Sequence, residues 1–177
     1  MPYDRFKHHR RSIRLKGHDY AQPGAYFVTI VTCKRECLFG EVANGDIQLN
    51  RFGAIAFEEW ERSRRIREEL ELDEFTVMPN HVHGILVIRS SVQTVVGAQG
   101  LAPLRRPPRS LGTFVCGFKS AVTKRINAVR GTPGMCVWQR NYHDEIVHND
   151  QDLYAARSYI RYNPRRWAYD RENPERR

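Results

Sequence analysis

Residues 78–88 have the sequence MPNHVHGILVI, in which two histidines flank one apolar residue and a β-branched apolar run follows. The Pro-Asn pair favours a turn, and the run rich in valine and isoleucine predicts a strand. Successive side chains of a strand point to opposite faces, so His81 and His83 share one face and Val82 points to the other. Two imidazoles side by side at the end of a sheet are a common start of a divalent metal site.

The histidine pair alone indicates a metal site only weakly, because histidines two apart on a strand are often ordinary polar residues. Two protein ligands would also leave a divalent ion under-coordinated. A metal site therefore requires a third ligand from elsewhere in the chain, with an open position for a substrate.

The spacing of apolar residues in the rest of the chain changes between a helical and a strand pattern. Residues 51–70 and 111–129 repeat apolar side chains at three and four positions, as amphipathic helices do. The Asn44-Gly45 pair predicts a tight hairpin. The predicted elements are, in order, a strand at 26–32, a hairpin of 38–43 with 46–49, a helix at 51–70, a strand at 74–77 paired with the 78–88 stretch, a helix at 111–129, a strand at 145–147 and a helix from Asn149 or Asp150 to about Tyr162. Antiparallel strands with helices on one face predict an α+β sandwich, ferredoxin-like or RRM-like, with a central antiparallel sheet and helices packed on it.

The last predicted helix has two distinct faces. Its apolar stripe consists of Leu153, Ala156 and Ile160. Pro164 limits its length, because the residue before a proline is disfavoured in the α region. Tyr159 and Asn163 are four residues apart, so they share a face that is offset from the stripe.

The chain has 177 residues and a formal charge of +9, which predicts one domain with a polyanionic partner. Of its 29 basic residues, 24 are arginine and five are lysine. Arginine makes bidentate contacts with phosphate and guanine, so this bias favours nucleic acid. An arginine-rich composition set by a GC-rich genome explains the bias equally well.

Cysteine spacing argues against a structural zinc site, and hydropathy argues against a membrane-spanning protein. The four cysteines, Cys33, Cys37, Cys116 and Cys136, lack the paired spacing of a zinc site. Scattered thiols without a signal peptide indicate a reducing compartment, and no apolar run is long enough to span a bilayer. We therefore expect a cytoplasmic, nucleoid-associated protein with no membrane partner.

Three segments are expected outside the regular elements. Residues 1–22 form a basic arm before the domain at 23–167, residues 89–110 form a mobile loop within it, and residues 168–177 form a charged tail. The arm, the loop and the helix at 111–129 carry candidate phosphate contacts. These candidates are Arg10, Arg11, Arg14, Lys16, Arg105, Arg106, Arg109, Lys119, Lys124 and Arg125. A solvated tail and solvated lysines explain the same residues equally well.

Two blocks of the sequence together resemble a known family. His-Val-His within MPNHVHGILVI resembles the HUH motif. The block VWQRNYHDEIVHNDQDLYAARSYIRYNPRRW at 137–167 resembles the segment that carries the catalytic tyrosine of single-tyrosine HUH transposases, in particular the REP-associated tyrosine transposases. The resemblance extends from RRSIRLKGHDYAQPGAYFVTI at 10–30 to Trp167, which is nearly the whole domain.

This resemblance implies an HUH endonuclease fold and an activity with named residues. Single-stranded DNA would bind beside a folded hairpin, and Mg²⁺ or Mn²⁺ would polarise the scissile phosphate. A tyrosine would then attack, leaving a 5′-phosphotyrosine and a free 3′-hydroxyl that can be rejoined without ATP. By the motif YIRYNP, Tyr159 corresponds to the nucleophile and Asn163 to the third metal ligand, beside His81 and His83. An amide oxygen is a hard ligand that suits Mg²⁺.

Other assignments stay open at this point. Tyr154 or Tyr162 could replace Tyr159 as the nucleophile, and Asn163 could simply end its helix. Members of the family often carry a histidine where Glu145 stands, so the resemblance does not assign an auxiliary catalytic role to this position. The protein could also be a non-catalytic hairpin DNA- or RNA-binding protein, or a rolling-circle replication initiator or relaxase-like nickase, although the chain has one tyrosine block and no helicase domain. The sequence does not specify the target repeat, nor whether a monomer or a homodimer acts, with the tyrosine in cis or in trans.

Overall fold

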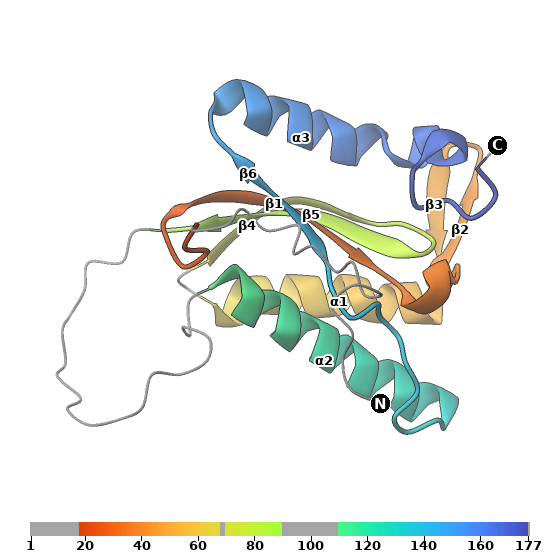
Figure 1. Cartoon of the computed structure of the whole chain (residues 1–177). Helices are drawn as coiled ribbons and strands as arrows, with labels where there is room; N and C mark the ends of the chain where they lie inside the picture. Colours follow the sequence, from red (N-terminus) through yellow and green to blue (C-terminus); the bar gives the residue numbers. More distant parts are fainter. Residues whose placement is uncertain (1–17, 68–69, 90–109, 177) are drawn as a thin grey trace, which may run out of the picture.

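The computed structural model describes residues 18–67, 70–89 and 110–176 (Figure 1). Its strands and α-helices are β1 (Gly24–Val31), β2 (Gly40–Ala43), β3 (Asp46–Leu49), α1 (Arg51–Ile66), β4 (Leu70–Val77), β5 (His81–Ile88), α2 (Leu111–Arg130), β6 (His143–Val147) and α3 (Asp150–Tyr162). Two short 3₁₀ helices, η1 (Cys33–Arg35) and η2 (Pro164–Tyr169), follow β1 and α3.

Four strands form one antiparallel sheet in the order β4-β5-β1-β6, and β2 and β3 form a separate hairpin. With α1 and α2 as the two crossovers, the succession β1-α1-β4-β5-α2-β6 is the ferredoxin-like arrangement. The β2-β3 hairpin is inserted after β1, and α3 is added after β6. The predicted α+β fold with a central antiparallel sheet is confirmed, as is the tight antiparallel pairing of β4 with β5.

Helices cover both faces of this sheet. α1 and α2 pack against each other on one face, whereas α3 lies across the other face (Figure 1). The prediction that the helices lie on one face is therefore wrong for α3. A signal for the second layer was present in the sequence, because a strand that is covered on both faces has a continuous apolar run, as residues 85–88 do.

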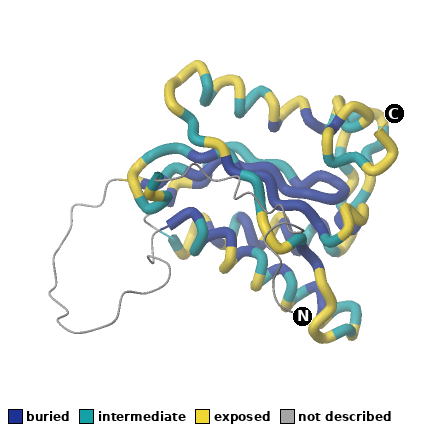
Figure 2. The backbone as a smooth tube through the Cα atoms, viewed as in Figure 1, coloured by how far each residue is buried: buried dark blue, intermediate teal, exposed yellow. Residues whose placement is uncertain are grey.

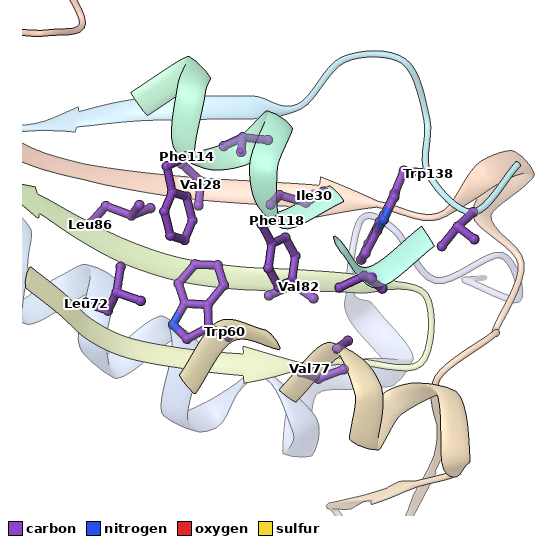
Figure 3. Packing of buried hydrophobic residues seen from close by; sticks show 14 of the residues in the cluster. Val28, Ile30, Trp60, Leu72, Val77, Val82, Leu86, Phe114, Phe118 and Trp138 are labelled. Carbon is purple, nitrogen blue, oxygen red and sulfur yellow. The ribbon is translucent and has the colours of Figure 1, made fainter. Parts of the chain in front are cut away.

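The main hydrophobic core lies between the sheet and the pair formed by α1 and α2 (Figure 3). The indole of Trp60 packs edge-on against the rings of Phe114 and Phe118, with centroids 5.2 and 5.4 Å apart. A Cβ atom at Gly84 of β5 would lie 2.3 Å from this indole, so only glycine lets the helix approach the strand this closely. Val82, which precedes Gly84 by two residues on the same face of β5, is fully buried in this core.

α1 is shorter than the sequence predicts. The predicted helix extends to Leu70, but α1 ends at Ile66, and Leu70 begins β4 opposite Ile88 of β5. Ile66, which was expected in the apolar stripe, is 66% exposed. Leu70 continued the repeat of three and four because the sheet also requires an apolar residue there, so periodicity alone placed the helix end one turn too late.

Turn and cap geometry accounts for three boundaries, whereas β4 and β6 begin four and two residues before the predicted strands at 74–77 and 145–147. Asn44 and Gly45 have positive φ angles of 55° and 82°, as a type I′ hairpin turn requires. Gly131 ends α2 in the left-handed conformation with a φ of 64°. Asn149 caps α3, and its side chain accepts a hydrogen bond from the backbone N–H of Asp152.

Burial is concentrated in the central strands, whereas α3 keeps much of its surface exposed (Figure 2). Residues 1–17 of the expected arm and residues 90–109 of the expected loop lie outside the described residues. Among the described residues, no helix is both long and apolar enough to cross a bilayer.

Candidate functional site

His81 and His83 lie on the α3 side of the sheet, opposite the main core. They alternate with Val82 along β5, and their rings are 4.3 Å apart between centroids at an interplanar angle of 67°. His81 is fully buried and His83 is 3% exposed. The predicted pairing of the two imidazoles on one face is therefore present, but deep under α3 and η2 rather than at an open end of the sheet.

Hydrogen bonds hold the Nδ1 atom of each ring. Asn80 donates from Nδ2 to the backbone carbonyls of Arg35 and Glu172 at 3.1 and 2.7 Å, which directs its Oδ1 toward His81. This oxygen lies 2.9 Å from His81 Nδ1 and can only accept, so Nδ1 carries the proton. His83 Nδ1 lies 2.9 Å from the hydroxyl oxygen of Thr29.

The Nε2 atoms of both histidines are buried and have no hydrogen-bond partner among the described residues. A buried polar atom without a partner costs free energy, so such atoms call for a missing ligand. A metal-binding histidine usually has its other ring nitrogen fixed by a hydrogen bond, as found for both rings. The pair fits two nitrogen ligands to a divalent ion.

Burial also keeps both rings neutral. It lowers the pKa of His81 to about 3 and the pKa of His83 well below its ordinary value, to which the neighbouring imidazole of His81 contributes further. A neutral imidazole is the form that binds metal. The site is therefore ready to accept a cation at neutral pH without losing protons.

Asp170 supplies a carboxylate to the histidine pair. It is 5% exposed, and its ligating oxygen and one nitrogen from each of His81 and His83 all lie within 4.8 Å of one another. Sequence reasoning missed Asp170 because it falls in the segment expected to be a charged tail. That segment packs back onto the sheet, where Glu172 receives the hydrogen bond from Asn80. In the sequence Asp170 is a single acidic residue seven positions after Asn163, and no repeat or motif distinguishes it from the other charged residues nearby.

Asn163 lies directly beside Asp170. It is 2% exposed, and its Nδ2 donates to Asp170 Oδ2 at 2.8 Å. The remaining amide oxygen is buried without a hydrogen-bond partner among the described residues. The site therefore offers a carboxylate oxygen close to two imidazole nitrogens, and an unpartnered amide oxygen on the residue bonded to that carboxylate. Oxygen and imidazole donors of this kind suit Mn²⁺ or Mg²⁺.

Tyr159 brings a hydroxyl group to the same carboxylate. Its hydroxyl donates to Asp170 Oδ2 at 3.3 Å, and its ring lies 5.1 Å from the ring of His83. Burial and the negative charge of Asp170 raise the pKa of Tyr159 to about 12, so the phenol is protonated at neutral pH. The side chain is still 41% exposed, so a substrate can reach it.

The i, i+4 spacing of Tyr159 and Asn163 directs both side chains to Asp170 within one chain. The alternative tyrosines of α3, Tyr154 and Tyr162, are 73% and 55% exposed. Among the described residues, neither is seen to contact the histidines or Asp170.

A cavity of about 710 Å³ opens beside this cluster, between α3 and the β1-β6 half of the sheet. Its lining includes Tyr159, His83 and Asp170 of the cluster, together with Phe27 of β1 and Glu145 of β6. Substrate atoms in this cavity would therefore lie next to the tyrosine hydroxyl.

Three of the predicted DNA contacts lie within the described residues, and these three lie away from this site. Arg10, Arg11, Arg14, Lys16, Arg105, Arg106 and Arg109 lie outside the described residues. Lys119, Lys124 and Arg125 are on α2, across the sheet from Tyr159. Lys119 donates to the backbone carbonyl of Gln139, and Arg125 pairs with Glu58 and Glu59 of α1, which leaves Lys124 as the exposed cation of the three.

Comparison with known proteins finds similarity in both sequence and structure. No family model matches the chain. It is 36% identical over 171 residues to an uncharacterized protein of Haemophilus influenzae, covering 92% of both chains. It also resembles the structure of a REP-associated tyrosine transposase bound to a REP hairpin, with a TM-score of 0.54 and 16% identity over 89% of this chain and 76% of that one. At this identity the structural match establishes a shared fold.

Proposed function

The chain belongs to the same family as the Haemophilus influenzae protein, and we propose that it is a metal-dependent tyrosine transposase of the REP-associated group. In this proposal it cleaves and rejoins single-stranded DNA next to hairpins through a 5′-phosphotyrosine intermediate. The fold it shares with the hairpin-bound transposase supports the assignment by analogy. The sequence blocks around His81 and Tyr159 support it independently.

One observation carries the proposal. The hydroxyl of Tyr159 is bonded to the carboxylate that lies within 4.8 Å of the two buried histidines. A nucleophile, two nitrogen ligands with unpartnered atoms and a hard oxygen ligand thus meet at one point. Most buried polar side-chain atoms have a hydrogen-bond partner, so two unpartnered Nε2 atoms on neighbouring rings beside a carboxylate favour a ligand site over a structural role.

His81 and His83 would hold the metal through Nε2, with Asp170 and Asn163 as the adjoining oxygen ligands. A bound Mg²⁺ or Mn²⁺ would polarise the scissile phosphate and stabilise the charge that develops on it. Asn80 and Thr29 would fix the ring orientations through the Nδ1 hydrogen bonds.

The chain's own residues then account for the transfer. Asp170 holds the Tyr159 phenol by its hydrogen bond and orients the oxygen for attack on phosphorus. The Tyr159 oxygen forms the new bond to phosphorus, and the phenol proton passes to solvent. The bond between phosphorus and the 3′-oxygen breaks, and the 3′-oxygen takes up a proton from solvent. A later attack by a 3′-hydroxyl reverses these changes and rejoins the strands.

DNA binding in this proposal depends on the basic segments. The arm at 1–22, the loop at 89–110 and Lys124 would contact phosphates, giving an affinity that falls with salt. The hairpin in the structural neighbour makes a hairpin with single-stranded flanks the substrate to test.

The test is incubation with hairpin oligonucleotides, labelled at either the 5′ or the 3′ end, in the presence of Mn²⁺. We expect an SDS-resistant adduct that contains the 3′-labelled fragment, because the tyrosine retains the 5′-phosphate, and a released 5′-labelled fragment. Tyr159→Phe should abolish the adduct, whereas the matched control Tyr162→Phe, at an exposed position, should retain it.

An adduct formed by Tyr159→Phe would contradict the assignment of the nucleophile. Salt-sensitive binding without any adduct would instead indicate a non-catalytic hairpin-binding protein.

A further inference from the structure

We propose that the cavity beside Tyr159 binds an unpaired nucleobase adjoining the scissile phosphate, and that Glu145 of β6 recognises the amino edge of this base. This inference rests on the proposed function, because the proposed nucleophile Tyr159 and two of the proposed metal ligands, His83 and Asp170, line the cavity. It adds a specificity-determining residue to a strand that the catalytic proposal does not use.

The cavity exists because α3 covers only part of its face of the sheet. α3 packs mainly over β4 and β5, which leaves the adjoining side of β1 and β6 open beneath it. Ile160 is the buried residue of its apolar stripe, whereas Leu153 and Ala156 are only half-buried. A helix with an incompletely covered apolar stripe above an open strand is a suitable wall for a ligand.

The dimensions and walls suit a base. The volume of about 710 Å³ is within the usual range of ligand pockets. Phe27, Val31 and Ala155 provide apolar surface, and the ring of Phe27 lies 5.2 Å from His83 and 5.8 Å from Tyr159. An aromatic ring at this distance from the nucleophile offers a surface on which a base can stack.

The charge of the cavity selects a base over a phosphate. Although the chain has a net charge of +9, this cavity is lined by four acidic residues, Glu145, Asp152, Asp170 and Glu172, against one arginine, Arg171. Carboxylates repel phosphate oxygens and accept hydrogen bonds from N–H groups. Cytosine, adenine and guanine offer exocyclic amino groups, whereas thymine does not.

Glu145 is the carboxylate in this set with the most accessible oxygens. Asp152 already accepts hydrogen bonds from the backbone N–H of His148 and the side chain of Asn149. Glu172 forms an ion pair with Arg35. The Glu145 side chain is 66% exposed, and its oxygen lies 3.6 Å from His143 Nε2. His143 Nδ1 is buried without a hydrogen-bond partner among the described residues. This pair presents polar atoms along one strand of the cavity.

The test compares Glu145→Gln with Glu41→Gln, which removes the same charge from an exposed position on β2. Fluorescent hairpins with single-stranded flanks are bound to the full chain in EDTA, so that no cleavage occurs. Each flank position carries in turn a cytosine, adenine, guanine, thymine or abasic site. We expect one position at which an amino-bearing base binds about tenfold more tightly than thymine or the abasic site, and Glu145→Gln should remove this preference.

The change in DNA affinity caused by Glu145→Gln distinguishes a base contact from a solvated charge. If Glu145 were merely a solvated charge, its removal would raise the affinity for every oligonucleotide, as Glu41→Gln should. Such a uniform rise would overturn the inference. A second variant, Ala155→Trp, should fill the cavity and abolish the base preference, whereas Ala128→Trp on the far face should not.

Failure of the inference is distinguishable from failure of the proposed function. An adduct at Tyr159 with no base preference that depends on Glu145 would leave the transposase proposal intact and refute the base site. A preference that depends on Glu145 without any adduct would support the base site and refute the catalytic proposal.

Discussion

The two faces of the sheet are built by the same strands from opposite chemistry. The face under α1 and α2 is packed with apolar and aromatic side chains, and Val82 and Leu86 of β5 are fully buried in the same core as Trp60 (Figure 3). The face under α3 buries His81 and His83, and their Nε2 atoms have no hydrogen-bond partner in the described part of the chain. Adjacent residues of one strand thus serve a core and a candidate site.

This difference suggests that one face of the sheet stabilises the fold and the other holds the candidate site. Buried polar atoms without partners are unfavourable, and nothing in the packing of the α3 face requires them. The core face also buries unpartnered atoms, the indole nitrogens of Trp60 and Trp138, but an indole N–H cannot bind a metal. On the α3 face the unpartnered atoms include two imidazole nitrogens and the Asn163 amide oxygen, which can, as expected if this face is retained for a ligand. Substitutions on the two faces should therefore have opposite consequences.

The largest expected effect is on the α3 face. His81→Gln should reduce cleavage of the hairpin oligonucleotide by at least about 100-fold, because one of two nitrogen ligands is lost. Salt-sensitive DNA binding should be largely kept, as should the thermal midpoint. Cleavage assays at matched DNA occupancy measure this effect. Loss of DNA binding together with cleavage would mean that the histidine contacts DNA or maintains the fold.

The converse effect is expected on the core face. Leu86 is fully buried, so Leu86→Ala should lower the free energy of unfolding by about 2–5 kcal/mol. Urea denaturation measures the loss, with Ile66→Ala at a 66% exposed position as the control. Cleavage per folded molecule should be unchanged. A variant that folds fully but has lost cleavage would show that the two faces are coupled.

Asp170 tests how far the site extends beyond the histidines. Asp170→Asn keeps the shape and a hydrogen-bond acceptor for Tyr159, but it should weaken Mn²⁺ binding at least about tenfold, because a charged oxygen ligand is lost. Calorimetric titration with Mn²⁺ measures this change. Glu172→Gln, which changes a neighbouring carboxylate paired with Arg35, is the control and should bind Mn²⁺ normally. Equal affinities for all three proteins would exclude Asp170 as a ligand.

A smaller effect is expected from pH in the metal-free protein. Burial lowers the pKa of His81 from 6.5 to about 3, so the unfolded chain takes up a proton below pH 6.5 that the folded chain resists. Stability is therefore complete above pH 6.5 and is lost as pH falls toward 3, by up to about 1.4 kcal/mol per pH unit for one histidine. Urea denaturation in EDTA at several pH values should show a shallower slope for His81→Gln. Identical slopes would mean that His81 is protonated in the folded chain.

The sequence predicted features that depend on local geometry. Alternation along residues 78–88 places His81 and His83 on one face, and the i, i+4 spacing directs Tyr159 and Asn163 to one side of their helix. The Asn44-Gly45 turn and the Asn149 cap have equally local causes.

The features that the sequence did not predict depend on tertiary packing. α3 covers the second face because residues 85–88 make both faces of β5 apolar. The continuous run carried this signal, but the order of strands and helices along the chain does not say which helix provides the cover. Asp170 reaches the histidines because η2 turns the chain back after Asn163, and no periodicity marks a short 3₁₀ segment that packs against a distant strand.

The central claim is that the α3 face holds a metal beside Tyr159. Anomalous diffraction from crystals soaked in Mn²⁺ tests it most directly, because the ion is located independently of activity. We predict one strong peak about 2 Å from Nε2 of both His81 and His83, with an oxygen of Asp170 or Asn163 also in contact. An unoccupied histidine pair at saturating Mn²⁺, or a peak bound elsewhere on the chain, would contradict the account.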